Sequence, residues 1–409
     1  MNKDILKIVF VTGWYSEKMG YSENFLPKAM AELGHEVHVI SSTAQVYFNS
    51  SAYTKTYEPF IGSPLVPPGS KKIDGYTLHR LPLRKTFLKS VIRIQGLEEK
   101  IRELAPDIVQ IFEINAVLSY DVAKAIQGSG ICLFTESHVH ASVFKTSDWK
   151  TRLKFKCLGL PAKIGFINRL TVKHYPIAAD VAKLSASYFS VPPEKIRLQS
   201  LGVDTGLFKP VTEITADKRH ALRKQLGFAE DDIVCIYTGR FTADKNPQCL
   251  ALAVQYLHEK GFTKFKGLFV GSGTDNDIAV LQSAKGNVVH PFVKVNNLPP
   301  FYQAADIGVW PKQESTSQLD AMACGLPIVV SNKVEVLERV EGNGLLYEEN
   351  NYIDLAQKLI ALQDPSLREA LAAVAIQKVK THFSWEAIAR ERLKDYTDCL
   401  VRRTDMNMP

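Results

Sequence analysis

The chain has 409 residues, of which 45% are hydrophobic and 23% are charged. This length predicts more than one domain, and the ordinary globular composition excludes a chain that is disordered over most of its length. Residues 1–199 carry 26 Lys and Arg against 17 Asp and Glu, a net charge of +9, whereas residues 200–409 carry 24 against 26. The basic first half indicates an anionic partner, and charge alone leaves both nucleic acid and anionic lipid open.

The cysteines and the apolar N-terminal run bear on where the protein works. None of the six cysteines has CxxC or zinc-ligand spacing, which favours a reduced, intracellular protein. The run LKIVFVTGW is short and lacks a small-residue cleavage pattern, so it predicts a buried strand rather than a signal peptide. No stretch is apolar over the roughly 20 residues that a membrane-spanning helix needs. We therefore expect a cytoplasmic protein.

The first half alternates predicted strands and helices. Hydrophobic periodicity predicts strands over 7–12, 37–40, 107–112, 131–135 and 196–198, and helices over 23–33, 118–127 and 180–189. Segment 41–80 is irregular, and we expect an excursion from the sheet there, with a hairpin as one form of it. Alternation of this kind builds a parallel sheet.

The second half restarts the alternation after a boundary near 199–232, where the sequence DTGLFKPVTE is loop-like. Strands are predicted over 233–238, 267–270, 288–291, 307–310 and 328–331, and helices over 248–259, 278–283, 298–304 and 319–324. Two such series predict an α/β protein with two Rossmann-like domains, 1–200 and 201–384. A final helix, predicted over 385–401, is free to pack back, so residues 385–409 are assigned to the first domain.

Ligands bind at the carboxyl ends of strands in open parallel sheets, so the loops after strands are the candidate sites. In the first domain, Gly20 and Tyr21 stand at a helix start, where free N–H groups attract an anion. Glu136, His138 and His140 follow the strand 131–135. A turn glycine and a surface loop are the plain alternatives. A metal site is disfavoured, because no further clustered His or Cys completes it.

In the second domain, Arg240 and Lys245 follow the strand 233–238, just before a helix. Arginine binds phosphate as a fork and lysine as a point charge, so the pair is suited to clamp a diphosphate. A solvated loop is the alternative for this pair. The nearby Gly271-Ser272-Gly273 sequence is a weaker signal, which fits a simple turn.

The loop after the strand 307–310 leads into a helix with a polar start. Hydroxyl and N–H groups in the first turn suit a phosphate, and carboxylates at either side suit sugar and ribose hydroxyls. An ordinary capped helix is the alternative, because Ser and Glu are common at helix starts. The residues concerned are Glu314, Ser315, Thr316, Ser317 and Asp320.

Together, these segments make the chain resemble a family 4 glycosyltransferase of the GT-B fold, over almost its whole length. The matching motifs, in the family's order, are LKIVFVTGW with LGHEVHVIS, LGVDTGLFKP, YTGRFTADKNP, VGSGTD, PFV with LPPFYQAADIGVWP, ESTSQLDAMACGLPIVVS and HFSWEAIARERLKDY. The resemblance implies two parallel-sheet domains that face each other across a cleft, with the C-terminal helix crossing back to the first domain.

The resemblance implies a retaining hexosyltransferase that usually needs no metal or other cofactor. The implied donor is a UDP- or GDP-sugar, and the implied acceptor is a saccharide or a lipid-linked molecule, as in polysaccharide or glycolipid assembly. Arg240 and Lys245 should bind the donor diphosphate, Glu314 the sugar hydroxyls and Asp320 the ribose hydroxyls, while backbone near Val293 should meet the nucleobase.

Further implied contacts lie in both domains. Gly20 should face the diphosphate and His138 should line the reaction centre. The remaining expected substrate contacts are Tyr21, Ser315, Thr316 and Ser317.

Two features depart from the family's pattern. The usual Glu-x7-Glu signature is Glu-x5-Asp here, from Glu314 to Asp320, and the glycine-rich first loop keeps one glycine, Gly20, followed by Tyr21. These changes indicate a reshaped donor pocket rather than a lost activity, because the other motif positions are intact.

Three other functions compete with glycosyl transfer. A nucleotide-sugar 2-epimerase shares the architecture and the diphosphate clamp, but the second-domain signature favours transfer. A non-catalytic nucleotide-sugar-binding protein would bind donor without turnover. A nucleic-acid binder is disfavoured, because the chain has no zinc finger, helix-turn-helix or exposed aromatic strand motif.

The segment 145–173 combines basic and apolar residues, which is the pattern of an element that lies at a membrane surface. We expect it to touch an anionic membrane at the inner face, where a lipid-linked acceptor resides. A solvated basic face with inward-packed apolar residues is the alternative. The basic residues are Lys145, Lys150, Arg152, Lys154, Lys156, Lys163, Arg169 and Lys173, beside the single acid Asp148, and the apolar ones are Trp149, Leu153, Phe155, Leu158, Leu160, Ile164 and Phe166.

Overall fold

The computed structural model describes residues 5–17, 19–51, 53–84, 91–140, 148–312 and 314–406. It divides into two compact units. Unit 1 comprises Met1–Leu201 and Trp385–Pro409, and unit 2 comprises Gly202–Ser384. Each unit is an α/β fold around one largely parallel sheet, so the predicted fold class, with two Rossmann-like domains, is confirmed.

The sheet of unit 1 has the strand order β3-β4-β2-β1-β5-β6-β7. All neighbouring strands are parallel except β3 and β4, which form an antiparallel hairpin. The hairpin lies in segment 41–80, where the sequence predicted an excursion from the sheet. That prediction is wrong for β3 and β4, because β4 pairs with β2 and the hairpin extends the sheet. The strands are β1 (Lys7–Thr12), β2 (Glu36–Ser42), β3 (Gly69–Ile73), β4 (Tyr76–Leu81), β5 (Ile108–Ile111), β6 (Cys132–Ser137) and β7 (Thr171–Pro176).

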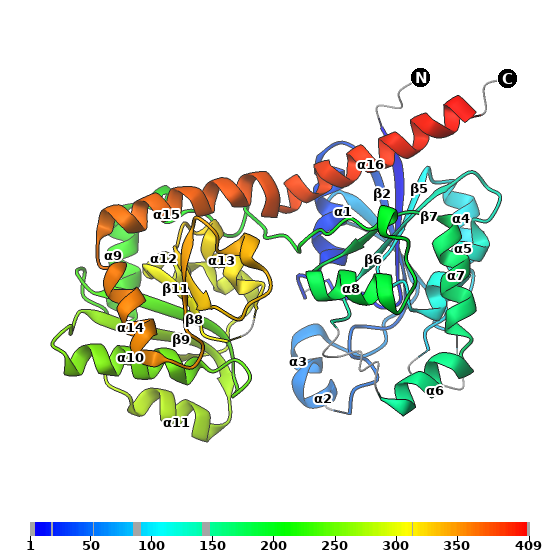
Figure 1. Cartoon of the computed structure of the whole chain (residues 1–409). Coiled ribbons are helices and arrows are strands. Elements are labelled where there is room, and N and C mark those ends of the chain that lie inside the picture. The colour runs from blue at the N-terminus through cyan, green and yellow to red at the C-terminus, as the bar shows by residue number, and fades with distance from the viewer. Residues whose placement is uncertain are drawn as a thin grey trace. The chain divides into compact units, whose positions relative to one another are not determined.

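Helices cover both faces of the unit 1 sheet. Alternate residues of β1 serve opposite faces: Ile8 and Phe10 pack with α1 and α16, whereas Val9 and Val11 pack with α4, α5 and α7 (Figure 1). Residues of both sets are buried. The helices are α1 (Ser22–Glu32), α2 (Tyr53–Thr56), α3 (Glu58–Ile61), α4 (Leu97–Leu104), α5 (Val117–Ala125), α6 (Trp149–Cys157), α7 (Leu160–Leu170), α8 (Ala179–Ser187) and α16 (Trp385–Met406).

The last strand of this sheet is not the one that the sequence predicted. The predicted strand 196–198 is wrong: Ile196 makes one isolated bridge to His174, and β7 pairs with β6 in its place. The sequence of β7, TVKHYP, mixes a lysine and a histidine with apolar residues. Its lack of clear alternation hid it within a basic stretch.

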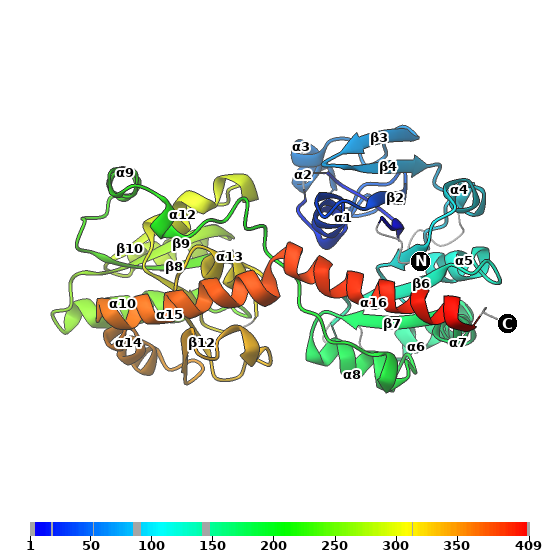
Figure 2. The same cartoon turned by 90° about the horizontal axis from the view of Figure 1, so that it is seen from above.

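Helix α16 returns to unit 1 from the far end of the chain, as predicted, and packs on α1 and β6 (Figure 2). This return brings Cys399 to Cys132 on β6, and the two form a disulfide with Cα atoms 6.8 Å apart. The expectation that the cysteines are all reduced is therefore wrong for this pair. The two residues are 267 positions apart, so spacing rules for nearby cysteines could not pair them.

Unit 2 has a six-stranded sheet with the order β10-β9-β8-β11-β12-β13. Every pair of neighbouring strands in it is parallel. A single apolar cluster fills both sides of the sheet. The strands are β8 (Ile233–Phe241), β9 (Phe265–Gly273), β10 (Asn287–Pro291), β11 (Ile307–Trp310), β12 (Ile328–Ser331) and β13 (Gly344–Tyr347).

The helices of unit 2 also form two layers. Helices α10 and α14 pack together on one face, and the pairs α9–α12 and α13–α15 lie on the other (Figure 1). Helix α9 lies in the boundary region, after the loop-like DTGLFKPVTE segment, at a place where the sequence predicted no helix. The helices are α9 (Ala216–Gln225), α10 (Pro247–Glu259), α11 (Asp275–Ser283), α12 (Pro299–Ala304), α13 (Ser317–Ala323), α14 (Tyr352–Ala361) and α15 (Pro365–Lys378).

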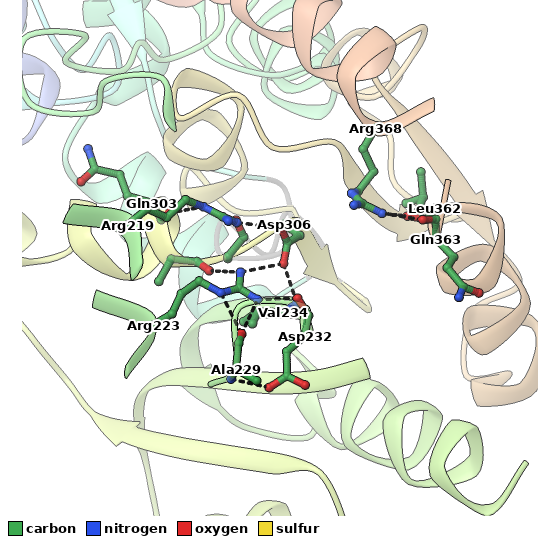
Figure 3. Close-up of polar contacts among 12 residues, drawn as sticks. Arg219, Arg223, Ala229, Asp232, Val234, Gln303, Asp306, Leu362, Gln363 and Arg368 are labelled. Carbon is green, nitrogen blue, oxygen red and sulfur yellow. Dashed lines mark hydrogen bonds and ion pairs between the residues drawn. The ribbon is translucent and has the colours of Figure 1, made fainter. Parts of the chain in front are cut away.

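A buried arginine network fastens α9 to the sheet of unit 2 (Figure 3). Arg223 lies 3.1 Å from Asp306 and donates to the Ala304 carbonyl at 2.9 Å. Arg219 binds the other carboxylate oxygen of Asp306 at 2.7 Å, and the Val234 N–H donates to Asp306 at 2.8 Å. Asp306 directly precedes β11, so this network lies at the amino end of that strand.

Among the described residues, no helix is both long enough and apolar enough to cross a membrane.

Candidate functional site

Three loops of unit 1 share one edge of its sheet. Strand β5 pairs with both β1 and β6 in parallel, so the carboxyl ends of these strands are neighbours. The loop after β1 leads to Gly20 and α1, Glu113 follows β5, and Glu136 and His138 stand at the end of β6. Ligand sites form at such an edge in parallel sheets.

His138 is held from two sides at this edge. Its Nε2 lies 2.6 Å from Oε1 of Glu136, and its backbone N–H donates to Oε1 of Glu113 at 3.1 Å. The ring also meets Phe112 edge-on, with centroids 6.2 Å apart. About 26% of the His138 side chain is exposed. The imidazole is therefore fixed in place while part of it stays accessible.

The second oxygen of Glu136 binds Arg392, which α16 supplies. The two side chains form a salt bridge and are almost fully buried, at 1% and 2% exposure. Arg392 also donates to the Gln199 amide and stacks over the Tyr175 ring at 4.4 Å. A residue near the C-terminus of the chain thus fixes the carboxylate that holds His138.

The charges of this cluster set its protonation. Burial acts to raise the pKa of Glu136, but the charges of Arg392 and His138 outweigh it and bring the pKa to about 2. Burial acts to lower the pKa of His138, but Glu136 above all, with Glu113 and Glu23, raises it to about 9. At neutral pH His138 is an imidazolium, which suits donating a hydrogen bond or stabilising negative charge rather than accepting a proton.

Two further carboxyl groups stand beside His138. Burial raises the pKa of Glu113 to about 7, against the opposing charge of His138. Burial likewise raises the pKa of Glu23, in the first turn of α1. Oε2 of Glu113 is buried and has no hydrogen-bond partner in the described ranges of the chain. The cluster therefore holds more acid than its two cations neutralise, which keeps part of it protonated.

Glu23, Glu113 and Arg392 were not among the residues predicted from the sequence. The position of Glu113, directly after a strand, is the same signal that singled out Glu136 and His138, so this residue could have been found. Arg392 lies mid-helix and more than 250 residues from Glu136. Nothing in its local sequence marks it.

Gly20 and Tyr21 lie at the start of α1, as predicted. Gly20 has a φ of 70°, which favours glycine, and the Tyr21 N–H donates to Asn24 Oδ1 at 2.9 Å. The Tyr21 phenol lies 3.2 Å from the Tyr47 hydroxyl, and its ring packs on a small cluster that contains Tyr53. Tyr21 thus forms part of an aromatic wall next to the loop.

Unit 2 offers a second set of loops at the carboxyl ends of β8 and β11. Arg240 lies at the end of β8 and is exposed. Its carbonyl accepts a hydrogen bond from the Tyr237 hydroxyl at 2.8 Å, but its guanidinium has no hydrogen bond or ion pair with any described residue. Lys245 is half-buried, and its Nζ donates to the Glu314 carbonyl at 3.0 Å. The structure therefore brings Lys245 to Glu314, from the neighbouring strand's loop.

Lys245 is half-buried among charges of both signs, with Asp244 and Glu314 opposing Arg240. Burial lowers the pKa of its ammonium, and the charge of Arg240 acts in the same direction, with Asp244 opposing. Two neighbouring cations repel each other, so an anion that binds between them interacts more favourably than an anion that binds one isolated cation. The pair is suited to a diphosphate, which carries several negative charges.

The Gly271-Ser272-Gly273 sequence is not a free turn. It forms the end of β9, paired with β8 from Gly239 to Phe241. A Cβ at Gly271 would lie 1.8 Å from the Gly239 carbonyl oxygen, so glycine is required for this close approach. The role of this motif in the structure is to let β9 run beside the strand that carries Arg240.

Glu314 lies just before α13. Its Oε1 accepts a hydrogen bond from the Glu335 N–H at 2.6 Å, which ties the loop after β11 to the loop after β12. Ser315 accepts from the Ser317 N–H at 3.3 Å, and their hydroxyls lie 3.2 Å apart, whereas Thr316 is exposed. The serines serve the helix start, as in an ordinary cap.

Asp320 and Val293 complete the predicted set in unit 2. Asp320 is half-buried in α13, its carboxylate has no hydrogen-bond partner among the described residues, and burial raises its pKa to about 8. Val293 follows β10, is half-buried, and packs on the core of unit 2. The neighbouring Phe292 is 67% exposed. Asp320 is thus a carboxyl group with unused hydrogen-bonding capacity.

Comparisons with known proteins agree with this layout. Residues 232–364, which include both the Arg240–Lys245 loop and α13, match the family model described as "Glycosyl transferases group 1". A D-inositol 3-phosphate glycosyltransferase of Xylanimonas cellulosilytica is 28% identical over 224 residues, which cover 51% of this chain and 53% of that protein. The first curated relatives are thus matched over about half their length. A D-inositol 3-phosphate glycosyltransferase of Kribbella flavida is 24% identical, and the match covers 91% of this chain and 88% of that protein.

Solved structures extend the likeness to nearly the whole chain. A glycosyltransferase from Rickettsia africae superposes with a TM-score of 0.67 at 15% identity, covering 97% of this chain and 99% of its own. Anabaena HepE, solved in complex with UDP and glucose, gives a TM-score of 0.62 at 18% identity, covering 95% and 98%. The chain has the GT-B fold.

Proposed function

We propose that this protein is a retaining glycosyltransferase that moves a hexose-type sugar from a UDP- or GDP-sugar to a saccharide or lipid-linked acceptor. The observation that carries the proposal is the pairing of Arg240 and Lys245 at the carboxyl end of β8, inside the segment that matches the glycosyl transferases group 1 model. An exposed guanidinium without a partner beside a half-buried ammonium is suited to a diphosphate.

The donor contacts follow from the loops of unit 2. The diphosphate lies on Arg240 and Lys245, and Glu314 and Asp320 bind sugar and ribose hydroxyls. Asp320 supports this role because, in the part of the chain that the structure describes, its carboxyl has no hydrogen-bond partner. The backbone near Val293 meets the nucleobase. UDP complexes of an Anabaena protein with the same fold support a nucleoside diphosphate as ligand.

Unit 1 supplies the acceptor side in this proposal. His138, charged at neutral pH and partly exposed, stabilises the negative charge that develops on the departing diphosphate. Glu136 and Arg392 act as positioning residues for His138. Gly20 and the start of α1, with Tyr21 beside it, complete the site.

Retention of configuration without a metal is part of the proposal. Asp275 and Asp277 follow β9 with the spacing of an Asp-x-Asp motif, which sequence reasoning overlooked. Asp277, however, accepts hydrogen bonds from the Thr274 N–H at 2.9 Å and the Thr274 hydroxyl at 2.6 Å, so it caps α11. The expected reaction is unaffected by EDTA and gives a product with the donor's anomeric configuration by NMR. An inverted product contradicts the proposal.

The place of work is proposed as the cytoplasm, at the inner face of a membrane. In α6, Trp149 and Leu153 are 65% and 52% exposed beside exposed Lys150, Arg152 and Lys156, whereas Phe155 is buried. The apolar residues thus divide between core and surface. Lys145 lies outside the described residues.

Co-sedimentation with liposomes tests this surface. Binding should rise with anionic lipid, fall with salt, and drop when Lys150, Arg152 and Lys156 become Glu, at about 1 kcal/mol for each charge. Indifference to anionic liposomes at low salt contradicts a membrane role and favours a freely diffusing acceptor.

A thermal-shift panel of UDP-, GDP- and ADP-sugars tests the donor, because a bound ligand stabilises the folded protein in proportion to RT ln(1 + [L]/Kd). We expect one base to stabilise the protein and to support transfer. Stabilisation without turnover on any acceptor would favour a non-catalytic binder, and interconversion of sugar epimers without transfer would favour a 2-epimerase. No stabilisation by any nucleotide sugar contradicts the donor site.

A further inference from the structure

Unit 1 contains a hollow of about 510 Å³, separate from the His138 cluster, at the carboxyl end of β4 and beside the edge strand β3. We call it the β3–β4 hollow. Its lining includes Glu17 from the loop after β1, Gln45 from the loop after β2, Ile61 from α3, Ser70 and Lys71 from β3, and Arg80 from β4. Of these elements, α3, β2, β3 and β4 are labelled in Figure 2.

Arg80 is a buried cation without a carboxylate partner among the described residues. The residue is 8% exposed. Its guanidinium donates to the Tyr15 carbonyl at 2.9 Å and, at 3.4 Å, to the Ser42 carbonyl, and it stacks over the Tyr15 ring. Arginine carries five N–H donors, so these contacts leave donors for a ligand. By contrast, Arg223 and Arg392, which are each 1% exposed, both bind a carboxylate.

Lys71 is the second cation of the hollow, and its present partner is weakly held. Its Nζ lies 2.9 Å from Glu17, with the two side chains 64% and 36% exposed. Exposed ion pairs contribute little to stability, so an incoming anion can compete with Glu17 for the ammonium. The nearby charge of Glu17 also supports the protonated form of Arg80, against the burial that lowers the Arg80 pKa.

The rest of the lining suits a sugar ring. Ile61 and Leu78 offer apolar surface for ring C–H groups. The Gln45 amide and the Ser70 hydroxyl, which also lies 2.7 Å from Nδ1 of His79, each have capacity for a further hydrogen bond. Gln45 is itself fixed, because its amide donates to the Ile61 carbonyl and accepts from Ser16 at 2.8 Å each. A placed amide on a partly apolar wall is typical of a specific polar ligand.

The hollow is joined to the first loop of the candidate site. The Ser16 hydroxyl binds both Gln45 and the Val46 N–H, and the Ser16 carbonyl accepts from Asn24 at 3.2 Å. Asn24 in turn holds the Tyr21 N–H. Both sites therefore lie on the same edge of unit 1, and hydrogen bonds through Ser16 and Asn24 connect them.

We propose that the β3–β4 hollow binds the acceptor, and that the acceptor is a saccharide that carries a phosphate. Arg80 and Lys71 take the phosphate, and Gln45 and Ser70 take ring hydroxyls. The assignment of this ligand as the acceptor rests on the proposed function, but its binding to the hollow can be measured without sugar transfer. The phosphate belongs either to a free sugar phosphate or to a lipid headgroup, which present the same chemistry to the two cations.

Isothermal titration of the full chain with glucose 6-phosphate, and with glucose as its uncharged match, tests the hollow. We expect binding of glucose 6-phosphate to weaken on the order of fivefold to tenfold in Lys71→Gln, since one charge-assisted contact is lost. Arg80→Lys should weaken it to a similar extent, because the fork geometry is lost while the charge stays. Lys72→Gln is the matched control: Lys72 is exposed on the same strand, next to Lys71, and does not line the hollow.

Two further arms keep this proposal distinct from the donor site. Lys245→Ala should bind glucose 6-phosphate like the wild type, and all hollow variants should bind UDP like the wild type. Binding to vesicles that contain phosphatidylinositol tests the lipid headgroup as the source of the phosphate. If vesicle binding weakens in Lys71→Gln and Arg80→Lys, the source is a lipid; if glucose 6-phosphate binding weakens instead, the source is a free sugar phosphate.

The proposal is overturned if neither probe depends on Lys71 and Arg80, if Lys72→Gln weakens binding equally, or if Lys245→Ala abolishes it. Because Arg80 also donates to two backbone carbonyls, the melting temperature of the Arg80→Lys variant is measured. If that variant is unfolded, the result for Lys71→Gln alone decides whether the hollow binds the phosphate. A failure of UDP binding in the wild type speaks against the donor site and leaves the result for the hollow intact.

Discussion

Each unit of the molecule buries one arginine against one carboxylate, but at opposite ends of its sheet. In unit 2, Arg223 binds Asp306 directly before β11, at the amino end of the strand (Figure 3). In unit 1, Arg392 binds Glu136 at the carboxyl end of β6. The two pairs share chemistry and burial, yet they stand at different edges of a parallel sheet.

The surroundings of the two pairs show what each is for. Asp306 receives Arg219, Arg223 and the Val234 N–H, so all its contacts fasten α9 and β8. One carboxylate oxygen of Glu136 binds Arg392, and the other binds His138, whose side chain is partly exposed. The Arg223–Asp306 pair thus fastens a helix to the sheet, whereas the Arg392–Glu136 pair holds a partly exposed imidazole.

Removal of either arginine gives the largest expected effect. Arg392→Met leaves the buried Glu136 without its strongest partner, and the free energy of unfolding should fall by about 3–5 kcal/mol. Arg223→Met should cost somewhat less, because Arg219 stays on Asp306. Urea denaturation measures both. In the folded fraction, turnover should fall in Arg392→Met and stay near wild type in Arg223→Met. Equal loss of turnover in both variants would contradict the division of roles.

The diphosphate clamp of unit 2 should show the next largest effect. Arg240→Ala or Lys245→Ala removes a cation that stabilises the departing diphosphate, so kcat/KM should fall by the equivalent of about 2–4 kcal/mol. Lys285→Ala is the control, since Lys285 is an exposed lysine of the same unit that lies between α11 and β10. Near-wild-type kcat/KM in both clamp variants removes the pair from the site.

The charge on Glu136 can be tested apart from its shape. Glu136→Gln should lower the pKa of His138 from about 9 towards its ordinary value of 6.5, as followed by NMR titration. Because the folded pKa is raised, the contribution of His138 to stability is complete below pH 6.5 and is lost as pH rises through about 9. A transfer rate that needs the imidazolium should fall over the same range and earlier in the variant. An unchanged His138 pKa means that Glu136 has no such influence.

Asp320 should give the smallest effect, with a pH dependence that identifies it. Its raised pKa means that the folded protein favours the neutral carboxyl, so this contribution is complete below pH 3.8 and is lost as pH rises through about 8. Asp320→Asn should therefore gain stability relative to wild type, by about 1–2 kcal/mol at pH 8.5 and less at pH 5, because the side chain is half-exposed. A gain that is equal at both pH values contradicts a buried, unpaired carboxyl.

The sequence predicts much of the fold because most strands are short apolar runs next to amphipathic helices. β1 and β11 occupy the ranges expected for them. The failures have physical causes. β7 mixes polar and apolar residues, and α9 carries few apolar residues, since two of its arginines do the packing. The β7 sequence therefore lacks the pattern typical of a strand, and the α9 sequence lacks the apolar stripe typical of a helix.

The candidate site is less predictable than the fold. Strand ends point to His138, Arg240 and Lys245, because local order along the chain is enough to place a loop. Arg392 and the Cys132–Cys399 disulfide depend on the return of α16 to unit 1. The return itself was predicted, but no local pattern shows which residues of α16 then meet β6. The shortened Glu314–Asp320 spacing shows a changed loop, but its tie to Glu335 appears only in the structure.

The central claim is that unit 2 binds the donor through its clamp while the His138 cluster of unit 1 serves the transfer. Calorimetric titration of UDP into wild type, Lys245→Ala and His138→Ala tests it most directly. The claim predicts that Lys245→Ala weakens UDP binding on the order of tenfold or more, and that His138→Ala binds UDP within about twofold of wild type while its turnover falls. Unchanged UDP affinity in Lys245→Ala, or an equal loss of affinity in both variants, would contradict it.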